Sequence, residues 1–293
     1  MNLLMKTFKK LLFTIPFLAG LLVLTVTAGL LLATLFDYRP PDSLQPDLIK
    51  PTGNMKVDDA SLTLMTWNIG YAGLGKEMDF FYDGGKQVRP SREFSKSYLD
   101  KIKTFLYHND SLDFILLQEV DRGSKRSYGA DQARLISEAL PHFNYTFAKN
   151  YDVPFVPVPI TNPMGKVFSG LMTLSKYDPL SYKRIQFPGN YSWPKNLFML
   201  DRCFLIQRFM LHGNKMLTLI NTHNSAFDDG SLRQKQMEML RSYALESYSK
   251  GNYVIVGGDW NQNPPGFDPE LISTGDVGVK NDLGIASASE VIA

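Results

Sequence analysis

The chain has 293 residues, a formal net charge of +2 at pH 7 and 44% hydrophobic residues. This length suits one large domain with an appendage, and this apolar content suffices for a globular core. The nearly neutral balance argues against a dedicated nucleic-acid-binding protein, which usually carries a marked basic excess. The single cysteine, Cys203, excludes an internal disulfide, and its apolar run Cys203–Ile206 predicts a buried residue rather than a catalytic thiol.

The amino-terminal segment differs from the rest of the chain. Residues 11–36 contain no charged side chain, which exceeds the roughly 20 apolar residues that a membrane-spanning helix needs. Lys6, Lys9 and Lys10 precede the segment and predict a cytoplasmic amino end, with the body of this single-pass protein on the other side of the membrane. The alternative is a cleaved signal peptide, whose apolar core usually covers only about 7–15 residues. We therefore predict a membrane anchor over residues 1–36.

Residues 37–59 are rich in proline, which opposes both helix and sheet. We predict a semi-extended linker there and a domain over residues 60–293. Within this domain, short apolar runs alternate with segments of helical spacing, which predicts a mixed α/β layered fold. Strands are expected at 61–67, 113–117, 145–148, 167–174, 180–187, 203–211, 216–221 and 253–256, and helices at 95–108, 130–140 and 231–248.

Four of the predicted strands end in polar residues suited to phosphoryl chemistry. These residues are Asn68, Glu119, His223, Asp259 and Asn261. One polar strand end is usually an ordinary turn, but four that converge would form a site. Glu119 offers the hard oxygen that Mg²⁺ prefers, and Asp259 would orient or deprotonate a water. His223 would donate to developing negative charge, while the two asparagines would hydrogen-bond phosphoryl oxygens.

The motifs Trp-Asn-Ile-Gly at 67–70, Gln-Glu-Val-Asp at 118–121, Asn-Thr-His at 221–223 and Gly-Asp-Trp-Asn at 258–261 occur in this order. Together they resemble the endonuclease/exonuclease/phosphatase family, which includes pancreatic-type deoxyribonucleases and neutral sphingomyelinases. The resemblance implies a four-layer α/β sandwich of two packed mixed sheets with outer helices. It also implies Mg²⁺ or Mn²⁺ as cofactor and in-line attack of water on phosphorus.

The resemblance assigns roles to individual residues. The family's metal-binding glutamate falls on Glu119 and its phosphate-contacting asparagines fall on Asn68 and Asn261. Its water-orienting aspartate falls on Asp259, and its first active-site histidine on His223. A second set, Arg202 and Asn221, is assigned to substrate binding, with a solvated arginine at a sheet edge as the alternative for Arg202.

The family's closing Ser-Asp-His motif is missing from this sequence. We read His108, His142 and His212 as ordinary surface or loop residues. Residues 284–293 are small and end without a clear strand, so we expect a domain truncated or frame-shifted near residue 284 and nearly inactive in this form. Its downstream coding sequence would test this expectation.

Two further segments have alternative readings. The loop 71–94 carries Lys86, Arg89 and Arg92, which would either meet an anionic substrate or only be solvated. The run 151–160 is unusually apolar for a loop, and we read it as a packed surface loop rather than a hydrophobic lip for lipid.

The sequence thus predicts a membrane-tethered, divalent-metal-dependent phosphodiesterase or phosphatase. The anchor and the near-neutral charge favour a lipid or a small phosphoester over nucleic acid as substrate. The alternatives are a secreted nuclease and a catalytically dead phosphate-binding module, and the missing histidine motif is the support for the latter. No protein partner is inferred.

Overall fold

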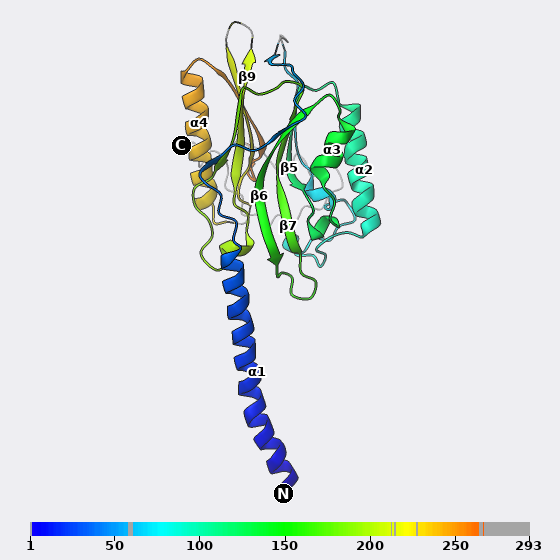
Figure 1. The fold of residues 1–293 in the computed structure, drawn as a ribbon, viewed down its shortest axis with the longest axis vertical. Helices are drawn as coiled ribbons and strands as arrows, with labels where there is room; N and C mark the ends of the chain where they lie inside the picture. The colour runs from blue at the N-terminus through cyan, green and yellow to red at the C-terminus, as the bar shows by residue number, and fades with distance from the viewer. Residues whose placement is uncertain are drawn as a thin grey trace.

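The computed structural model describes residues 2–57, 61–211, 213, 215–226, 228–263 and 266. The described chain folds into two sheets, and helices cover the outer faces of both (Figure 1). One sheet has the strand order β2-β6-β7-β5-β4, and the other has the order β1-β8-β9-β10-β11 with β3 beside β9. The two sheets and their outer helices make four layers, so the predicted sandwich is confirmed.

The strand bounds are β1 Ser43–Leu44, β2 Leu48–Ile49, β3 Lys56–Val57, β4 Leu64–Asn68, β5 Phe114–Asp121, β6 Asn144–Val156, β7 Gly165–Ser175, β8 Ser181–Gln186, β9 Cys203–Leu211, β10 Met216–His223 and β11 Tyr253–Asp259. The helices are α1 Asn2–Leu35, α2 Arg92–His108, α3 Gln132–Ala139 and α4 Ser231–Ser249, with short 3-10 turns at Gly70–Ala72, Phe81–Asp83, Lys125–Ser127 and Lys195–Phe198.

Side-chain hydrogen bonds explain where two of the helices begin. Helix α2 begins three residues before the predicted start because the Ser91 hydroxyl accepts a hydrogen bond from the Phe94 N–H and caps the first turn. Asp131 caps α3 in the same way, through the N–H of Arg134. The strands that carry the motifs run further than their apolar cores predicted, and β5 and β10 continue through the motif residues.

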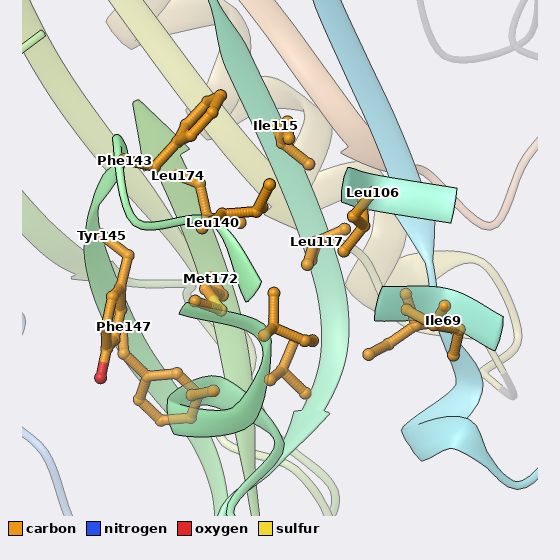
Figure 2. Packing of buried hydrophobic residues seen from close by; sticks show 14 of the residues in the cluster. Ile69, Leu106, Ile115, Leu117, Leu140, Phe143, Tyr145, Phe147, Met172 and Leu174 are labelled. Atoms are coloured by element: carbon orange, nitrogen blue, oxygen red, sulfur yellow. The ribbon is translucent and has the colours of Figure 1, made fainter. Parts of the chain in front are cut away.

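Three apolar layers hold the sandwich together. On the outer face of the first sheet, α2 contributes Leu106 to a cluster with Ile115 and Leu117 of β5 (Figure 2), and α3 contributes Ile136 to the same cluster. Between the sheets, Phe114 and Leu116 of β5 meet Phe209 and Leu219 of the second sheet. On the outer face of that sheet, α4 contributes Leu240 to a cluster with Ile220 and Phe204. Cys203 is fully buried between the sheets, as the sequence predicted.

The segment that the sequence suggested as a linker takes part in both sheets. Strand β1 pairs with β8, β2 pairs with β6 and β3 pairs with β9. Each of these strands has only two residues, which suits a proline-rich chain that has lost many backbone donors. The boundary near residue 59 therefore remains a prediction, although residues 43–57 are attached along the sandwich.

Helix α1 projects from one end of the body (Figure 1). Its stretch Leu12–Leu35 has 24 residues with a mean hydropathy of 2.3 and is not buried against the body. At a rise of about 1.5 Å per residue it is roughly 36 Å long, which is enough for a hydrocarbon core of about 30 Å. Length and composition thus fit a membrane span, and a signal sequence would meet the same criteria.

Candidate active site

Four strands of the two sheets end at the same end of the sandwich. Strands β4 and β5 are parallel, β10 and β11 are parallel, and a hydrogen bond of 2.7 Å from Asn68 Nδ2 to Asp259 Oδ2 joins the ends of β4 and β11 across the sheets. This convergence brings together Asn68, Glu119, His223, Asp259 and Asn261, which all line one cavity of about 200 Å³. With Arg202, which lines the same cavity, six of the seven site residues predicted from the sequence share one site.

Glu119 reaches this cavity through a β-bulge. Leu117 and Val120 pair with Met172 and Gly170, so β5 has one extra residue at this point. Glu119 adopts a left-handed backbone with φ 56°, which costs a non-glycine residue on the order of 1–3 kcal/mol. Regular alternation would turn its side chain toward the outer helices, because Leu117 faces that side and Gln118 faces the other sheet. The bulge instead points Glu119 at Asn68, whose Nδ2 donates to Glu119 Oε1 at 3.1 Å.

The Asn68 amide holds the two acidic residues in place. Its Nδ2 donates to both carboxylates, and its Oδ1 accepts a hydrogen bond of 3.0 Å from the Gly70 N–H, which fixes the amide orientation. Two negative side chains are thereby kept near one another, and a cation between them would lower their mutual repulsion. In this geometry the Asn68 amide joins both carboxylates through one nitrogen.

Asp259 is fixed at both oxygens. Oδ1 accepts the Asn261 N–H at 2.9 Å, and Oδ2 lies 3.7 Å from His223 Nε2. The glycine before it is required, because a Cβ at Gly258 would lie 2.1 Å from the Thr222 carbonyl oxygen. Asn261 is itself held by a 2.8 Å hydrogen bond from its Nδ2 to the Asn224 carbonyl and by Arg233 Nη1, which donates to its carbonyl.

His223 is buried and neutral at physiological pH. Burial, with the positive charges of Arg202 and Arg126, holds its pKa well below the usual value of 6.5. A neutral imidazole has one N–H to donate and one nitrogen to accept. Its Nδ1 is buried and has no hydrogen-bond partner among the described residues.

Arg202 lies on the cavity wall and donates to the His223 carbonyl at 3.5 Å. Burial lowers its pKa, against the opposing effect of Glu119 and Asp259. Asn221 lies elsewhere. Its amide is buried between the sheets, accepts a hydrogen bond from Gln118 Nε2 at 2.8 Å and donates to the Met172 carbonyl. It does not line the cavity, so this position gives it a structural role, and substrate contact by Asn221 remains without support.

Arg126 is a second cation on the cavity wall that the motifs did not indicate. Its guanidinium contacts the fully buried Asp121 through Nη2 at 2.9 Å and lies 4.0 Å from the centre of the Tyr71 ring. Burial lowers the pKa of Arg126, but Asp121 more than offsets this, so the group stays charged. In the sequence, only Asp121, the last residue of the second motif, could have indicated a buried cation nearby, and the motifs assign it no partner.

The other predicted features have clear positions. Lys86, Arg89 and Arg92 do not line the cavity, and Arg92 stacks over the Tyr128 ring instead. His108 ends α2 and His142 is exposed after Pro141, as expected. His212 and the segment 284–293 lie outside the described residues.

The donor set fits a hard divalent cation in part. Glu119 and Asp259 supply carboxylate oxygens, and Mg²⁺ is usually held by one or two carboxylates, with water and substrate oxygens completing its shell. Within the described part of the chain, no cluster of three or more acidic, histidine or cysteine side chains is placed to hold a metal.

Comparison with known proteins gave a family and a set of distant structural neighbours. The model of the endonuclease/exonuclease/phosphatase family matches residues 65–277. No curated protein matches the chain. Among solved structures, a humanised D. rerio TDP2 is 17% identical with a TM-score of 0.42, covering 74% of this chain and 72% of its own. The human Nocturnin catalytic domain is 18% identical with a TM-score of 0.43, covering 77% and 71%. ANGEL2, a 2',3'-cyclic phosphatase, is 19% identical with a TM-score of 0.47. The match covers 69% of this chain and 54% of the ANGEL2 chain, which is about half of that protein.

Proposed function

Since the chain belongs to the endonuclease/exonuclease/phosphatase family, we propose that it is a membrane-tethered, divalent-metal-dependent hydrolase of phosphoester bonds. The observation that carries the proposal is the convergence of Glu119 and Asp259, from different sheets, on one amide at the cavity. A fold alone does not need two facing carboxylates. Their placement, held by Asn68, suits a site that receives a cation and an anionic substrate.

In this proposal Glu119 is the metal ligand, and Mg²⁺ or Mn²⁺ when bound supplies positive charge to the phosphoryl oxygens. Asp259 orients the attacking water, because it lines the cavity and both of its oxygens are held in place, with Oδ2 close to His223 Nε2. The neutral His223 donates its N–H to a phosphoryl oxygen as negative charge develops there. Water attacks phosphorus in line and the alcohol leaves on the opposite side.

For the two asparagines we propose a different role from the phosphate contact that the resemblance implies. Both amide groups already make hydrogen bonds within the protein, Asn68 to the carboxylates and Asn261 to the Asn224 carbonyl. We propose that they mainly keep the site in position. Contact with the substrate phosphate is assigned first to Arg202 and Arg126, which bring two buried cations to the cavity wall.

The substrate proposed is a lipid or small phosphoester rather than nucleic acid. The net charge of +2 is not the marked basic excess typical of nucleic-acid-binding proteins, and the cavity wall includes apolar side chains such as Leu74, Phe80 and Met199. The alternative is a phosphate-binding module without turnover, which would use the same cavity. These two alternatives differ in whether phosphate ester is consumed.

The direct test is hydrolysis of bis(p-nitrophenyl) phosphate by the full chain with Mg²⁺ or Mn²⁺, compared with EDTA. Glu119→Gln keeps the shape and removes the charge, so we expect near-total loss of turnover. The matched control is Glu138→Gln on the exposed face of α3, where Glu138 pairs only with Arg134, and this variant should keep full activity. Full activity of Glu119→Gln at low Mg²⁺ would exclude the assignment, and metal-dependent binding of phosphate without turnover would favour the binding module.

The membrane tether has its own test. With the amino end in the cytoplasm, as Lys6, Lys9 and Lys10 predict, a protease added to intact cells or spheroplasts should digest the body. Protection of the body while a known external marker is cleaved would reverse this orientation. Recovery of a soluble product that begins near Asp37 would show a cleaved signal peptide instead.

A further inference from the structure

The strand directions place the cavity and the root of α1 at the same end of the body. Strands β4, β5 and β6 run in one direction, because β4 is parallel to β5 and both β5 and β6 are antiparallel to β7. The turn between β6 and β7 therefore lies at the end where Asn68 and Glu119 face the cavity. Figure 1 shows this hairpin projecting from the end of the body at which α1 leaves.

The tip of the β6–β7 hairpin, residues 154–164, exposes apolar side chains. Its base is packed, since Val156 and Met164 belong to a buried cluster. Its tip is not: Ile160 is 90% exposed, and Phe155 and Val158 are exposed as well. No residue from 153 to 165 carries a charge. The run that the sequence suggested as a packed surface loop is thus packed only at its base, and its tip is an uncharged apolar projection.

The segment between β8 and β9 adds another exposed apolar side chain at this end of the body. Trp193 is 61% exposed, and its indole N–H donates to Thr34 Oγ1, near the end of α1, at 3.4 Å. The same segment supplies Tyr191 and Met199 to the cavity wall. One short piece of chain therefore contacts the apolar helix on one side and lines the cavity on the other.

Cationic side chains lie next to the exposed apolar ones. Lys166 follows the hairpin tip and is exposed, Arg89 donates to Asn162 Oδ1 at 3.0 Å, and Lys195 lies over the Tyr191 ring. Apolar tips with a tryptophan and flanking lysine or arginine match the layers of a bilayer surface, where indole rings lie at the headgroup level and cations meet lipid phosphates. Moving exposed isoleucine and phenylalanine side chains out of water lowers the free energy of the system.

We propose that the β6–β7 tip and Trp193 enter the interface of the bilayer that α1 spans and hold the cavity over the lipid headgroups, so that the substrate is the phosphoester of a membrane phospholipid. This inference rests on the proposed function and on its membrane tether. A tether alone would let the body tumble above the membrane. Further contacts beside α1, made by the hairpin tip and Trp193, fix its orientation and present the cavity to the lipid surface.

The first experiment measures the depth of the hairpin tip in the bilayer. The full chain is reconstituted into nanodiscs of dioleoylphosphatidylcholine and dioleoylphosphatidylglycerol, with an environment-sensitive fluorophore attached to Ile160→Cys. The native Cys203 is fully buried, so it does not compete for the label. Lys215→Cys, exposed in the turn between β9 and β10 at the opposite end, is the matched control.

We expect spin-labelled lipids to quench the label at position 160 several-fold more than the label at position 215. Equal, weak quenching at both positions would overturn the docking surface. A blue-shifted label at position 160 that lipid does not quench would also overturn it, because that result would indicate contact with a second copy of the chain.

The second experiment separates the docking surface from the chemistry. Ile160→Asp and Trp193→Ser should lower the release of phosphate or headgroup from the same lipids in vesicles at least tenfold, and leave hydrolysis of bis(p-nitrophenyl) phosphate unchanged. Tyr253→Ser is the matched control, since Tyr253 is an aromatic residue with the same 61% exposure at the far end of β11. It should affect neither substrate.

The two failures can be told apart. Turnover of the soluble ester without any turnover of vesicle lipid would overturn the lipid substrate and leave the proposed hydrolase standing. Lipid quenching at position 160 without turnover of any ester would support the docking surface and contradict the proposed hydrolase.

Discussion

Breaking the buried ion pair of Asp121 and Arg126 is expected to destabilise the body next to the cavity. The Asp121 side chain has no exposure and Arg126 only 7%, and Arg126 makes contacts of 2.9, 3.1 and 3.3 Å with the two carboxylate oxygens. Replacing Arg126 by methionine keeps the apolar stem but leaves a carboxylate without its cation. Removing one partner of such a pair typically costs about 3–5 kcal/mol, because an uncompensated charge stays buried.

That cost corresponds to an unfolding constant raised roughly 10²- to 4 × 10³-fold, since each 1.4 kcal/mol or so is a factor of ten. For a body of this size, about 2–4 °C of Tm is lost per kcal/mol, so Arg126→Met should lower Tm by roughly 6–20 °C. The assay is thermal unfolding of the full chain in detergent, followed by tryptophan fluorescence. Arg134→Met on the surface of α3 is the control, and its exposed pair with Glu138 should contribute less than about 1 kcal/mol.

A second variant shows whether the charge is the cause. Adding Asp121→Asn to Arg126→Met removes the buried charge, so we expect the double variant to regain part of the lost Tm. A single variant that loses less than about 2 °C would refute the reasoning, and would mean that water or a bound cation replaces the guanidinium. A double variant that is less stable than Arg126→Met would assign the effect to packing over Tyr71 instead.

Three further predictions concern the site and its surroundings. Asp259→Ala and His223→Ala should each lower kcat on the order of 10²-fold or more, and a change in KM alone would make them binding residues. Asn221→Ala should destabilise the fold by about 1–3 kcal/mol, because Gln118 Nε2 loses its shortest acceptor and the Met172 carbonyl loses the Asn221 Nδ2 donor. It should leave KM unchanged, and a raised KM with unchanged Tm would restore a substrate role. Burial, and next the negative charge of Asp37, raise the pKa of Asp201 to about 7, so the folded state favours its protonated form. As pH rises from 3.8, the pKa of Asp201 in the unfolded chain, to about 7, the folded state loses the stability of the protonated carboxyl. The Tm of Asp201→Asn should therefore exceed that of the parent by an amount that grows across this pH range and levels off above it. Thermal unfolding from pH 4 to pH 9 measures this gain, and a gain that does not change with pH would contradict the assignment.

The fold followed from the sequence where periodicity and strand-end chemistry agreed. Strand β9 has the predicted bounds, because it is a mostly apolar run that is buried on both faces over most of its length. Helix α4, a regular helix with one buried face, ends within one residue of its prediction. Strand β6 was predicted to end at Ala148 but continues to Val156. Its second half pairs with β7 across Pro154 and two register shifts, which no pattern of alternating residues indicates.

The site was less predictable than the fold, because several of its contacts join distant parts of the chain. Arg126 meets the ring of Tyr71, and Arg233 of α4 fixes the carbonyl of Asn261. Such contacts depend on how loops return to the sheet ends. Strand motifs identify the residues that need fixed backbone positions, whereas the residues that hold them come from neighbouring loops and helices without a spacing of their own.

The alternation of side chains explains both what the sequence revealed and where it failed. In β4, Leu64 and Asn68 face the same side, between the sheets, and in β11 the same holds for Ile255 and Asp259. Each inner row thus changes from apolar to polar as the interior between the sheets opens into the cavity. The same rule applied to β5 would place Gln118 between the sheets, as observed, and Glu119 under the outer helices, which is wrong.

Only the extra residue in β5 turns Glu119 back to the cavity, and its left-handed backbone stores strain that regular pairing would release. Deletion of Val120 would restore the pairing register that the bulge interrupts. We expect that chain to lose metal-dependent turnover although Glu119 is still present, because its carboxylate would no longer face Asn68. Retained turnover in the deletion variant would show that Glu119 can reach the metal without the bulge, and would assign the left-handed residue to local packing alone.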